Sequence, residues 1–275
     1  MNSRVRHLYF ACVLLCSVPL CVSAQLNTLL HFFPDSTYIH TVSADQYAHQ
    51  MKIENILISK NIVSSMGGVF PVFNFDLPGT TVQASLGTSV HFEVRPQGQA
   101  HVVSTDFYID YLILDVPLRH DFFYRFVTGH TSHHLSDNWY EKLNYTHAIH
   151  YSRDYIQSFL MYSHPDICLA SLGADYAYVF HLAGKESKRW KIDLSLERMW
   201  GHLSESIVLF SSINVKLHQE AGFASSNAYQ LGIEMPMQYG KRLRIAYQLR
   251  HGLDERGQFF PNHIFRQTIG LYIET

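Results

Sequence analysis

Apolar and polar residues alternate along most of this chain. Between Trp190 and Glu197 the even positions hold Trp, Ile, Leu and Leu, while the odd positions hold Lys, Asp, Ser and Glu. The same period of two recurs over residues 90–95, 229–235 and 242–250. This alternation predicts strands with one apolar and one polar face. Charged residues in register on the polar face are typical of a membrane barrel, whose apolar face meets lipid and whose polar face lines the lumen.

The pattern predicts about twelve strands, an even number as expected when both ends of a barrel lie on the periplasmic side. Each run is roughly long enough for a tilted strand to cross a bilayer. The predicted strands cover residues 46–58, 68–76, 80–95, 101–116, 121–133, 142–156, 167–181, 189–199, 205–218, 227–238, 241–251 and 264–274. We therefore predict an all-β fold, a single antiparallel transmembrane β-barrel.

The start of the chain has the features of a bacterial export signal. Arg4 and Arg6 precede an apolar run from Leu8 to Leu20, and small residues stand just before Gln25. This order is typical of a cleaved signal peptide. We expect a signal peptide at 1–24, a periplasmic N-terminal segment at 25–45 that packs at or inside the barrel mouth, and the β-barrel at 46–275. The expected location is the outer membrane of a Gram-negative bacterium.

Cysteine content and charge narrow the chemistry and the partners. Three of the four cysteines fall in the predicted signal peptide, so Cys168 has no partner for an intramolecular disulfide. A lipoprotein signal with lipidation at Cys21 is the weaker alternative to cleavage before Gln25, because Leu20 is larger than the residues usually found before a lipidated cysteine. Without the two signal-peptide arginines, 21 − 2 = 19 basic residues face 23 acidic ones, which gives no reason to expect nucleic acid. The expected partners are membrane lipid and the outer-membrane assembly machinery, and the oligomeric state stays open.

Three stretches resemble a bacterial family catalogued as domain of unknown function 1207. They are Phe33-Pro34-Asp35 with Ala44-Asp45, then Gly129 to Asp137, and Tyr151-Ser152-Arg153-Asp154-Tyr155. The resemblance implies an exported outer-membrane protein and brings no known activity. The family's middle motif has Gly-Asp-Glu where this chain has Ser136-Asp137-Asn138, so a role that rests on the last carboxylate does not transfer.

One short motif could carry catalysis. His130 and Ser132 form a His-x-Ser motif, and Asn144 follows twelve positions after the serine. This resembles outer-membrane phospholipase A, in which an Asn on the next strand orients the histidine, and the lipid A 3-O-deacylase barrels, which have Glu in the third place. The chemistry needs a hydroxyl nucleophile, an imidazole that takes its proton and a polar group that fixes the imidazole tautomer.

Strand parity predicts where these side chains point. His130 and Ser132 share a face with Phe122, Tyr124 and Phe126, so we expect them on the lipid-facing side, with Arg125 in the lumen. Asn144 has the parity of Ser152 and Asp154, which the predicted strand 142–156 places on the lumen side. A β-bulge would be needed to bring Asn144 to His130.

Two other interpretations of this region stay open. It can be a strand end rich in imidazole and hydroxyl groups, since short motifs recur freely. It can also be a metal site of His130, His133, His134 and Asp137, although His133 should point away from the other two histidines. We therefore name no metal ligand among the candidate site residues.

We expect a structural or binding role for the barrel, with His134, Asp137 and Arg153 as candidate binding residues. Arg153 and Asp154 are expected to form a charge pair in the lumen or a structural clasp. The alternative function is an outer-leaflet lipid acyl hydrolase that uses Ser132, His130 and Asn144. No cofactor is expected, apart from calcium in the hydrolase alternative.

Overall fold

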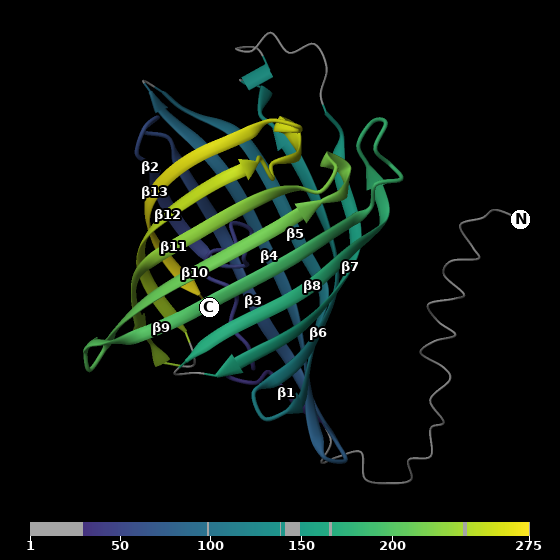
Figure 1. Cartoon of the computed structure of the whole chain (residues 1–275), viewed down its shortest axis with the longest axis vertical. Helices are drawn as coiled ribbons and strands as arrows, with labels where there is room; N and C mark the ends of the chain where they lie inside the picture. Colours follow the sequence, from purple (N-terminus) through teal and green to yellow (C-terminus); the bar gives the residue numbers. More distant parts are fainter. Residues whose placement is uncertain are drawn as a thin grey trace, which may run out of the picture.

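The structure is a computed structural model that describes residues 30–97, 99–137, 139–140, 149–164, 167–238 and 241–274. The predicted signal peptide and Asn144 lie outside these residues. Thirteen strands form one antiparallel sheet (Figure 1). They are β1 (Leu30–Phe32), β2 (Met51–Ile56), β3 (Ile62–Leu77), β4 (Thr80–Gln97), β5 (Gln99–Arg119), β6 (Phe122–Leu135), β7 (Tyr151–His164), β8 (Cys168–His181), β9 (Trp190–Ser204), β10 (Ile207–His218), β11 (Ala224–Pro236), β12 (Arg242–Leu253) and β13 (His263–Glu274).

Strands β2 to β13 close into a barrel of twelve. Each pairs with its neighbour in the chain, and the first wall strand, β2, pairs with the last, β13, from Met51↔Ile273 to Ile56↔Thr268. β2 covers only the start of β3, and β1 pairs with the far end of the same edge, from Leu30↔Phe75 to Phe32↔Phe73. The predicted all-β antiparallel barrel of about twelve strands is confirmed. No helix among the described residues is long and apolar enough to span a membrane.

The alternation read from the sequence is the alternation of the wall. On β9, Leu196 points outward and is 49% exposed, while its neighbour Glu197 points into the lumen and is 1% exposed. The same contrast holds around the barrel, so the buried interior is polar and the exposed surface carries most of the large apolar side chains. A wall built this way is suited to lipid outside and a hydrogen-bonded lumen inside.

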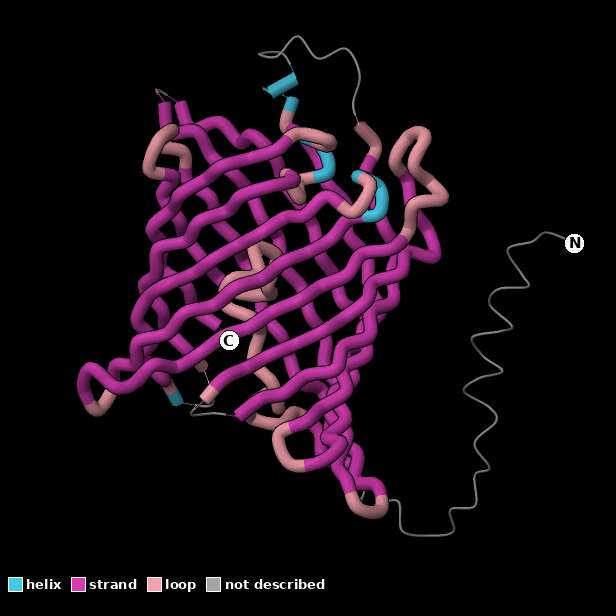
Figure 2. The backbone as a smooth tube through the Cα atoms, viewed as in Figure 1, coloured by secondary structure: helices cyan, strands magenta, loops and turns pink. Residues whose placement is uncertain are grey.

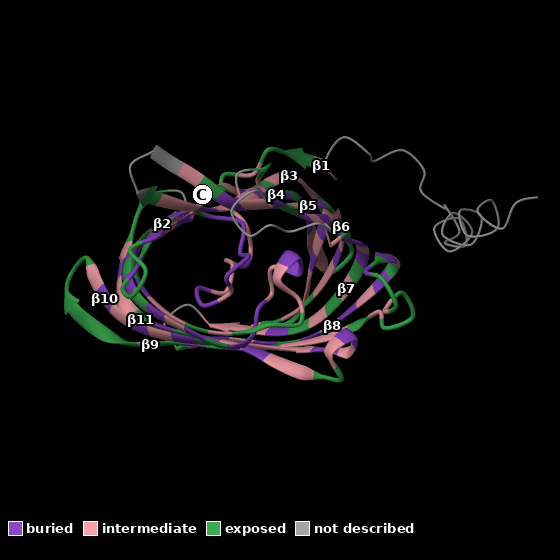
Figure 3. Ribbon diagram, turned by 90° about the horizontal axis from the view of Figure 1, so that it is seen from above, coloured by how far each residue is buried: buried purple, intermediate pink, exposed green. Residues whose placement is uncertain are grey.

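The lumen is filled by the chain itself. Residues 33–50, here called the inner segment, run from the edge of β3 beside β1 into the ring of strands (Figures 2 and 3). The backbone N–H groups of Ser43 and Thr41 donate to Glu197 and Glu274 of the wall, at 2.8 and 2.6 Å. Arg242 joins these two carboxylates to Glu234 in a buried ion cluster. Such a cluster fixes the inner segment because each of its charges has a partner.

Two glycines of the described chain leave room for this filling. A Cβ on Gly87 of β4 would lie 2.5 Å from Cδ2 of His49, so the His49 ring stands on bare backbone. A Cβ on Gly257, in the loop between β12 and β13, would overlap the ring of Tyr151. That loop folds inward at the end of the barrel with the longer loops, and the Gly257 N–H donates to His133 Nδ1 at 3.1 Å. The inner segment and this loop therefore fit against specific wall positions.

Candidate functional site

The His-x-Ser motif lies near the end of β6, on the outward face of the wall. In the β6–β7 pairing His130 is directly opposite Asp154, and Ser132 is opposite Ser152. Residues opposite each other in an antiparallel pair share a face. His130 Nδ1 lies 2.5 Å from Asp154 Oδ1, and the two side chains are 31% and 29% exposed. The wall thus carries a His–Asp pair beside the serine.

Ser132 has a histidine two residues away on each side. Its hydroxyl lies 3.2 Å from Nε2 of His134, which is exposed and contacts the edge of Phe107. Among the described residues the serine hydroxyl makes no hydrogen bond to His130. Ser132, His130 and His134 nevertheless share the outward face, because they alternate with buried residues along β6.

The expectation that Asp154 and Ser152 belong to the lumen is wrong. β7 begins at Tyr151 and ends at His164, about eight residues later than the predicted strand 142–156 at each end. On this strand the exposed side chains are Ile156 and Leu160, so the even positions face outward. Asp154 therefore occupies the position beside His130 that was predicted for an orienting group. Asn144 lies outside the described residues, and no role for it is tested.

Arg153 points into the lumen and pairs with a different acid. Its Nη2 donates to Asp175 Oδ1 at 2.6 Å and to the carbonyl of Arg189 at 3.0 Å, and its guanidinium lies over the ring of Phe180. The expected Arg153–Asp154 charge pair does not form, because adjacent residues of a strand point to opposite faces.

The structure separates the residues of the metal interpretation. His133 is buried in the lumen with Nδ1 3.1 Å from Asp106, while His130 and His134 face outward. Asp137 is exposed just beyond β6. Within the described part of the chain, no group of three or more His, Cys, Asp or Glu side chains could hold a metal ion.

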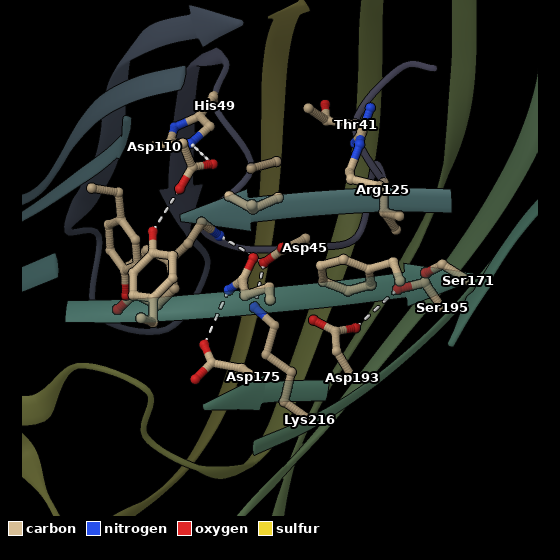
Figure 4. A pocket seen from close by; sticks show the side chains of 18 of the residues that line it. Thr41, Asp45, His49, Asp110, Arg125, Ser171, Asp175, Asp193, Ser195 and Lys216 are labelled. Carbon is tan, nitrogen blue, oxygen red and sulfur yellow. Dashed lines mark hydrogen bonds and ion pairs between the residues drawn. The ribbon is translucent and has the colours of Figure 1, made fainter. Parts of the chain in front are cut away.

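A second site, which the sequence analysis missed, lies inside the barrel. A cavity of about 160 Å³ separates the inner segment from the inward faces of β5 to β10 (Figure 4). Lys216 Nζ, on its edge, lies 2.6 Å from Asp45 of the inner segment and 3.2 Å from Glu255 of the β12–β13 loop. Asp110 accepts hydrogen bonds from Tyr155 and lies 2.8 Å from His49 Nε2. The alternation of the strands predicts that these wall residues face the lumen. It does not predict that the inner segment contacts them.

Two glutamates in the loops beside the cavity have pKa values below the ordinary value of a glutamate. Burial alone would raise the pKa of Glu255, but the nearby Lys216 and His218 and a hydrogen bond from Ser226 lower the pKa to about 2. Burial also opposes the charge of Glu220, in the turn after β10, yet a hydrogen bond from His218 and the nearby Lys191 lower its pKa to about 2. Both carboxylates are therefore anionic inside this end of the barrel.

The fold is similar to solved outer-membrane enzymes. The Salmonella typhi outer membrane phospholipase, seen as a dimer with bound calcium, is 12% identical with a TM-score of 0.53, over 87% of this chain and 94% of that chain. Outer membrane phospholipase A from Escherichia coli is 13% identical with a TM-score of 0.54, over 88% and 95%. At such identities the likeness shows the fold alone. No curated protein matches the chain.

A family of proteins of unknown function matches residues 34–273. This range includes the three motifs that suggested the family from the sequence, apart from Phe33, which precedes it by one residue. The sheet that it spans is an outer-membrane-type β-barrel whose lumen is filled by its own N-terminal residues. The chain therefore belongs to the DUF1207 family, proteins of unknown function.

Proposed function

We propose that this protein is a lipid acyl hydrolase of the outer membrane, with Ser132 as the nucleophile, His130 as the base and Asp154 as the group that orients the base. The observation that carries the proposal is the 2.5 Å contact between His130 Nδ1 and Asp154 Oδ1 on the outward face of the wall. A histidine held at Nδ1 by a carboxylate presents Nε2 as a proton acceptor, which is the arrangement of a serine hydrolase.

The location of this pair supports a function beyond wall stability. Ionisable groups on the lipid-facing side of a barrel are destabilising, with a cost that falls near the membrane surface. The same face of β7 continues with Ile156 and Leu160, which are suited to acyl chains. A half-exposed His–Asp pair at the end of an apolar stripe lies where a lipid ester would meet the wall.

The reaction follows from ordinary acyl transfer. The Ser132 hydroxyl turns from His134 towards His130, and Oγ attacks the ester carbonyl while its proton moves to His130 Nε2. Asp154 keeps the proton on Nδ1 and balances the imidazolium charge. The imidazolium then protonates the leaving alkoxide, which departs as the alcohol. Water, deprotonated by the same imidazole, attacks the acyl-serine carbonyl. The ester bond to Ser132 then breaks, the fatty acid leaves, and the imidazolium returns the proton to Ser132 Oγ.

The described residues around Ser132 do not make a calcium site. Calcium takes six to eight oxygen ligands, commonly with several carboxylates. Near Ser132 the described residues supply Asp154, which is bonded to His130. No step of the proposed reaction is therefore assigned to a metal ion.

The proposal includes a location in the outer membrane and two kinds of partner, lipid and the assembly machinery. The barrel would lie in the outer membrane with the end of β6 and the start of β7 on the outer side. It would be inserted by the outer-membrane assembly machinery and would take membrane lipid as its substrate. The outward apolar face and the likeness to outer-membrane barrels support this location.

The test measures fatty acid release by purified, folded protein from phospholipid and from lipid A, with and without calcium. Ser132→Ala should lower the rate by several orders of magnitude. Ser211→Ala is the matched control, because Ser211 also faces outward, on β10, where its hydroxyl bonds Trp200. Heat-dependent migration on a denaturing gel checks folding of each variant. No release by the wild type, or full activity in Ser132→Ala, would overturn the proposal.

A further inference from the structure

The cavity inside the barrel has one cation without a direct ion pair to a described residue. Its lining includes four basic side chains, Arg125, Arg153, Lys191 and Lys216. Arg125 pairs with Asp115, Arg153 with Asp175, and Lys216 with two acids. Lys191 differs, because among the described residues no carboxylate lies within 4.0 Å of its ammonium. Its described contact is with the ring of Tyr151, 5.8 Å away.

The same lining has one carboxylate that no cation neutralises directly. Asp45, Asp110, Asp175 and Glu255 each contact a lysine, an arginine or a histidine. Asp193 instead accepts from the Ser195 hydroxyl at 3.3 Å (Figure 4) and from the Asn214 amide at 2.7 Å, both through Oδ1. Its second oxygen has no hydrogen-bond partner within the described chain.

These two groups lie side by side. Lys191 and Asp193 are two residues apart on β9, so both point into the lumen with their Cα atoms about 7 Å apart. Charges enclosed by a protein are costly unless they are paired. A neutral solute that carries both charges can pair with both residues and leave the ion balance of the lumen unchanged. A solute with a single charge would satisfy one residue and add a net charge.

The geometry points to a binding site for a small zwitterion, whose carboxylate meets Lys191 and whose ammonium meets Asp193. The serine hydroxyls of Ser171 and Ser195 line the same part of the cavity and offer further hydrogen bonds. The volume of about 160 Å³ limits the ligand to the size of a small amino acid. The site lies on the opposite side of the wall from Ser132 and does not depend on the proposed hydrolase.

The test is calorimetric titration of the folded, detergent-solubilised full chain with glycine and with 4-aminobutyrate. Butyrate and butylamine are the singly charged controls. We expect binding of at least one zwitterion and no detectable binding of the singly charged pair. Lys191→Met and Asp193→Asn should each weaken binding at least tenfold. Lys188→Met, in the exposed loop before β9, is the matched control and should bind like the wild type.

A second measurement covers variants that fail to fold. In the wild type, bound zwitterion should slow acetylation of Lys191 relative to Lys188, as measured by mass spectrometry. Zwitterion binding that both variants weaken, or selective protection of Lys191, supports the site. A folded wild type that binds no zwitterion and shows no protection has a cavity that holds water alone, and the inference is then wrong. Unchanged affinity in both folded variants would overturn it equally.

Discussion

Asp45 and Lys216 are 171 positions apart in the chain, yet Oδ1 of the first lies 2.6 Å from Nζ of the second. The same ammonium lies 3.2 Å from Glu255 Oε2. One side chain of β10 therefore holds both the inner segment and the inward-folded loop between β12 and β13. The two parts that fill the lumen depend on a common contact.

The first prediction concerns this contact. Lys216→Met should destabilise the barrel by about 3 kcal/mol, because it leaves the luminal carboxylates of Asp45 and Glu255, which are 26% and 9% exposed, without their cation. It should also loosen both luminal parts, so that channel events appear in planar bilayers where the wild type is silent. Lys188→Met removes an exposed charge and should change neither property. Equal stability and equal conductance in Lys216→Met and the wild type would show that the contact holds nothing in place.

The second prediction concerns the position of the inner segment on the wall. Gly87→Ala should displace the His49 ring, because the new methyl group would lie 2.5 Å from it and 3.1 Å from Cβ of Asp110. We expect protease to cleave within residues 33–50 faster in the folded Gly87→Ala variant than in the wild type. In a His49→Ala background the same substitution should have a much smaller effect, since the ring is gone. Additive effects of the two substitutions would contradict the proposed contact.

The third prediction concerns pH. The pKa of Glu255 and that of Glu220 lie at about 2, below the ordinary value of 4.5. A carboxyl group whose pKa is lowered by folding stabilises the protein at pH values above its pKa in the unfolded chain. This contribution is lost as pH falls through the pKa of the group in the folded protein. Each glutamate contributes on the order of 3 kcal/mol at neutral pH.

The barrel should accordingly lose stability between about pH 5 and pH 2, and the temperature of its gel shift should fall over that range. Glu255→Gln should be less stable at pH 7 and should show a weaker dependence on acid. A gel-shift temperature that is flat from pH 7 to pH 2.5 would exclude this role for the two loop glutamates.

The fourth prediction identifies the base of the proposed hydrolase. His130 has the orienting carboxylate, whereas His134 has the closer contact with Ser132. His130→Ala should abolish fatty acid release, and His134→Ala should lower it by less than tenfold. Asp154→Ala should lower kcat more than it changes KM, because Asp154 positions the base and does not bind lipid. A larger loss in His134→Ala than in His130→Ala would transfer the role of base to His134.

The sequence predicted the barrel well because alternation along a strand records which side chains face outward and which face the lumen. It located β7 poorly for a physical reason. At the start of this strand both faces are polar, with Ser152 and Asp154 outward and Arg153 inward, so apolar and polar positions do not alternate there. Because both faces are polar there, the sequence does not show which face Asp154 belongs to. The partner of His130 could therefore not be predicted.

The luminal cavity was beyond prediction for a different reason. The wall residues that line it can be predicted from alternation. The rest of its lining comes from the inner segment, whose residues 33–50 show no regular apolar and polar pattern. These residues are held by side chains such as Glu197 and Gln248, more than 150 positions away. Contacts between a wall and an irregular chain leave no period in the sequence.

The pairing of β2 with β13 makes this barrel dependent on its last residues. A chain that stops before His263 would retain eleven wall strands but would lack the strand that joins both sides of the seam. The unpaired N–H and C=O groups of β2 and β12 would then face lipid, where no water can satisfy them. Buried charges such as Glu54 and Arg250 would lose their enclosure at the same time. Insertion into a membrane is therefore expected to be all-or-none, with completion decided by the final twelve residues of the wall.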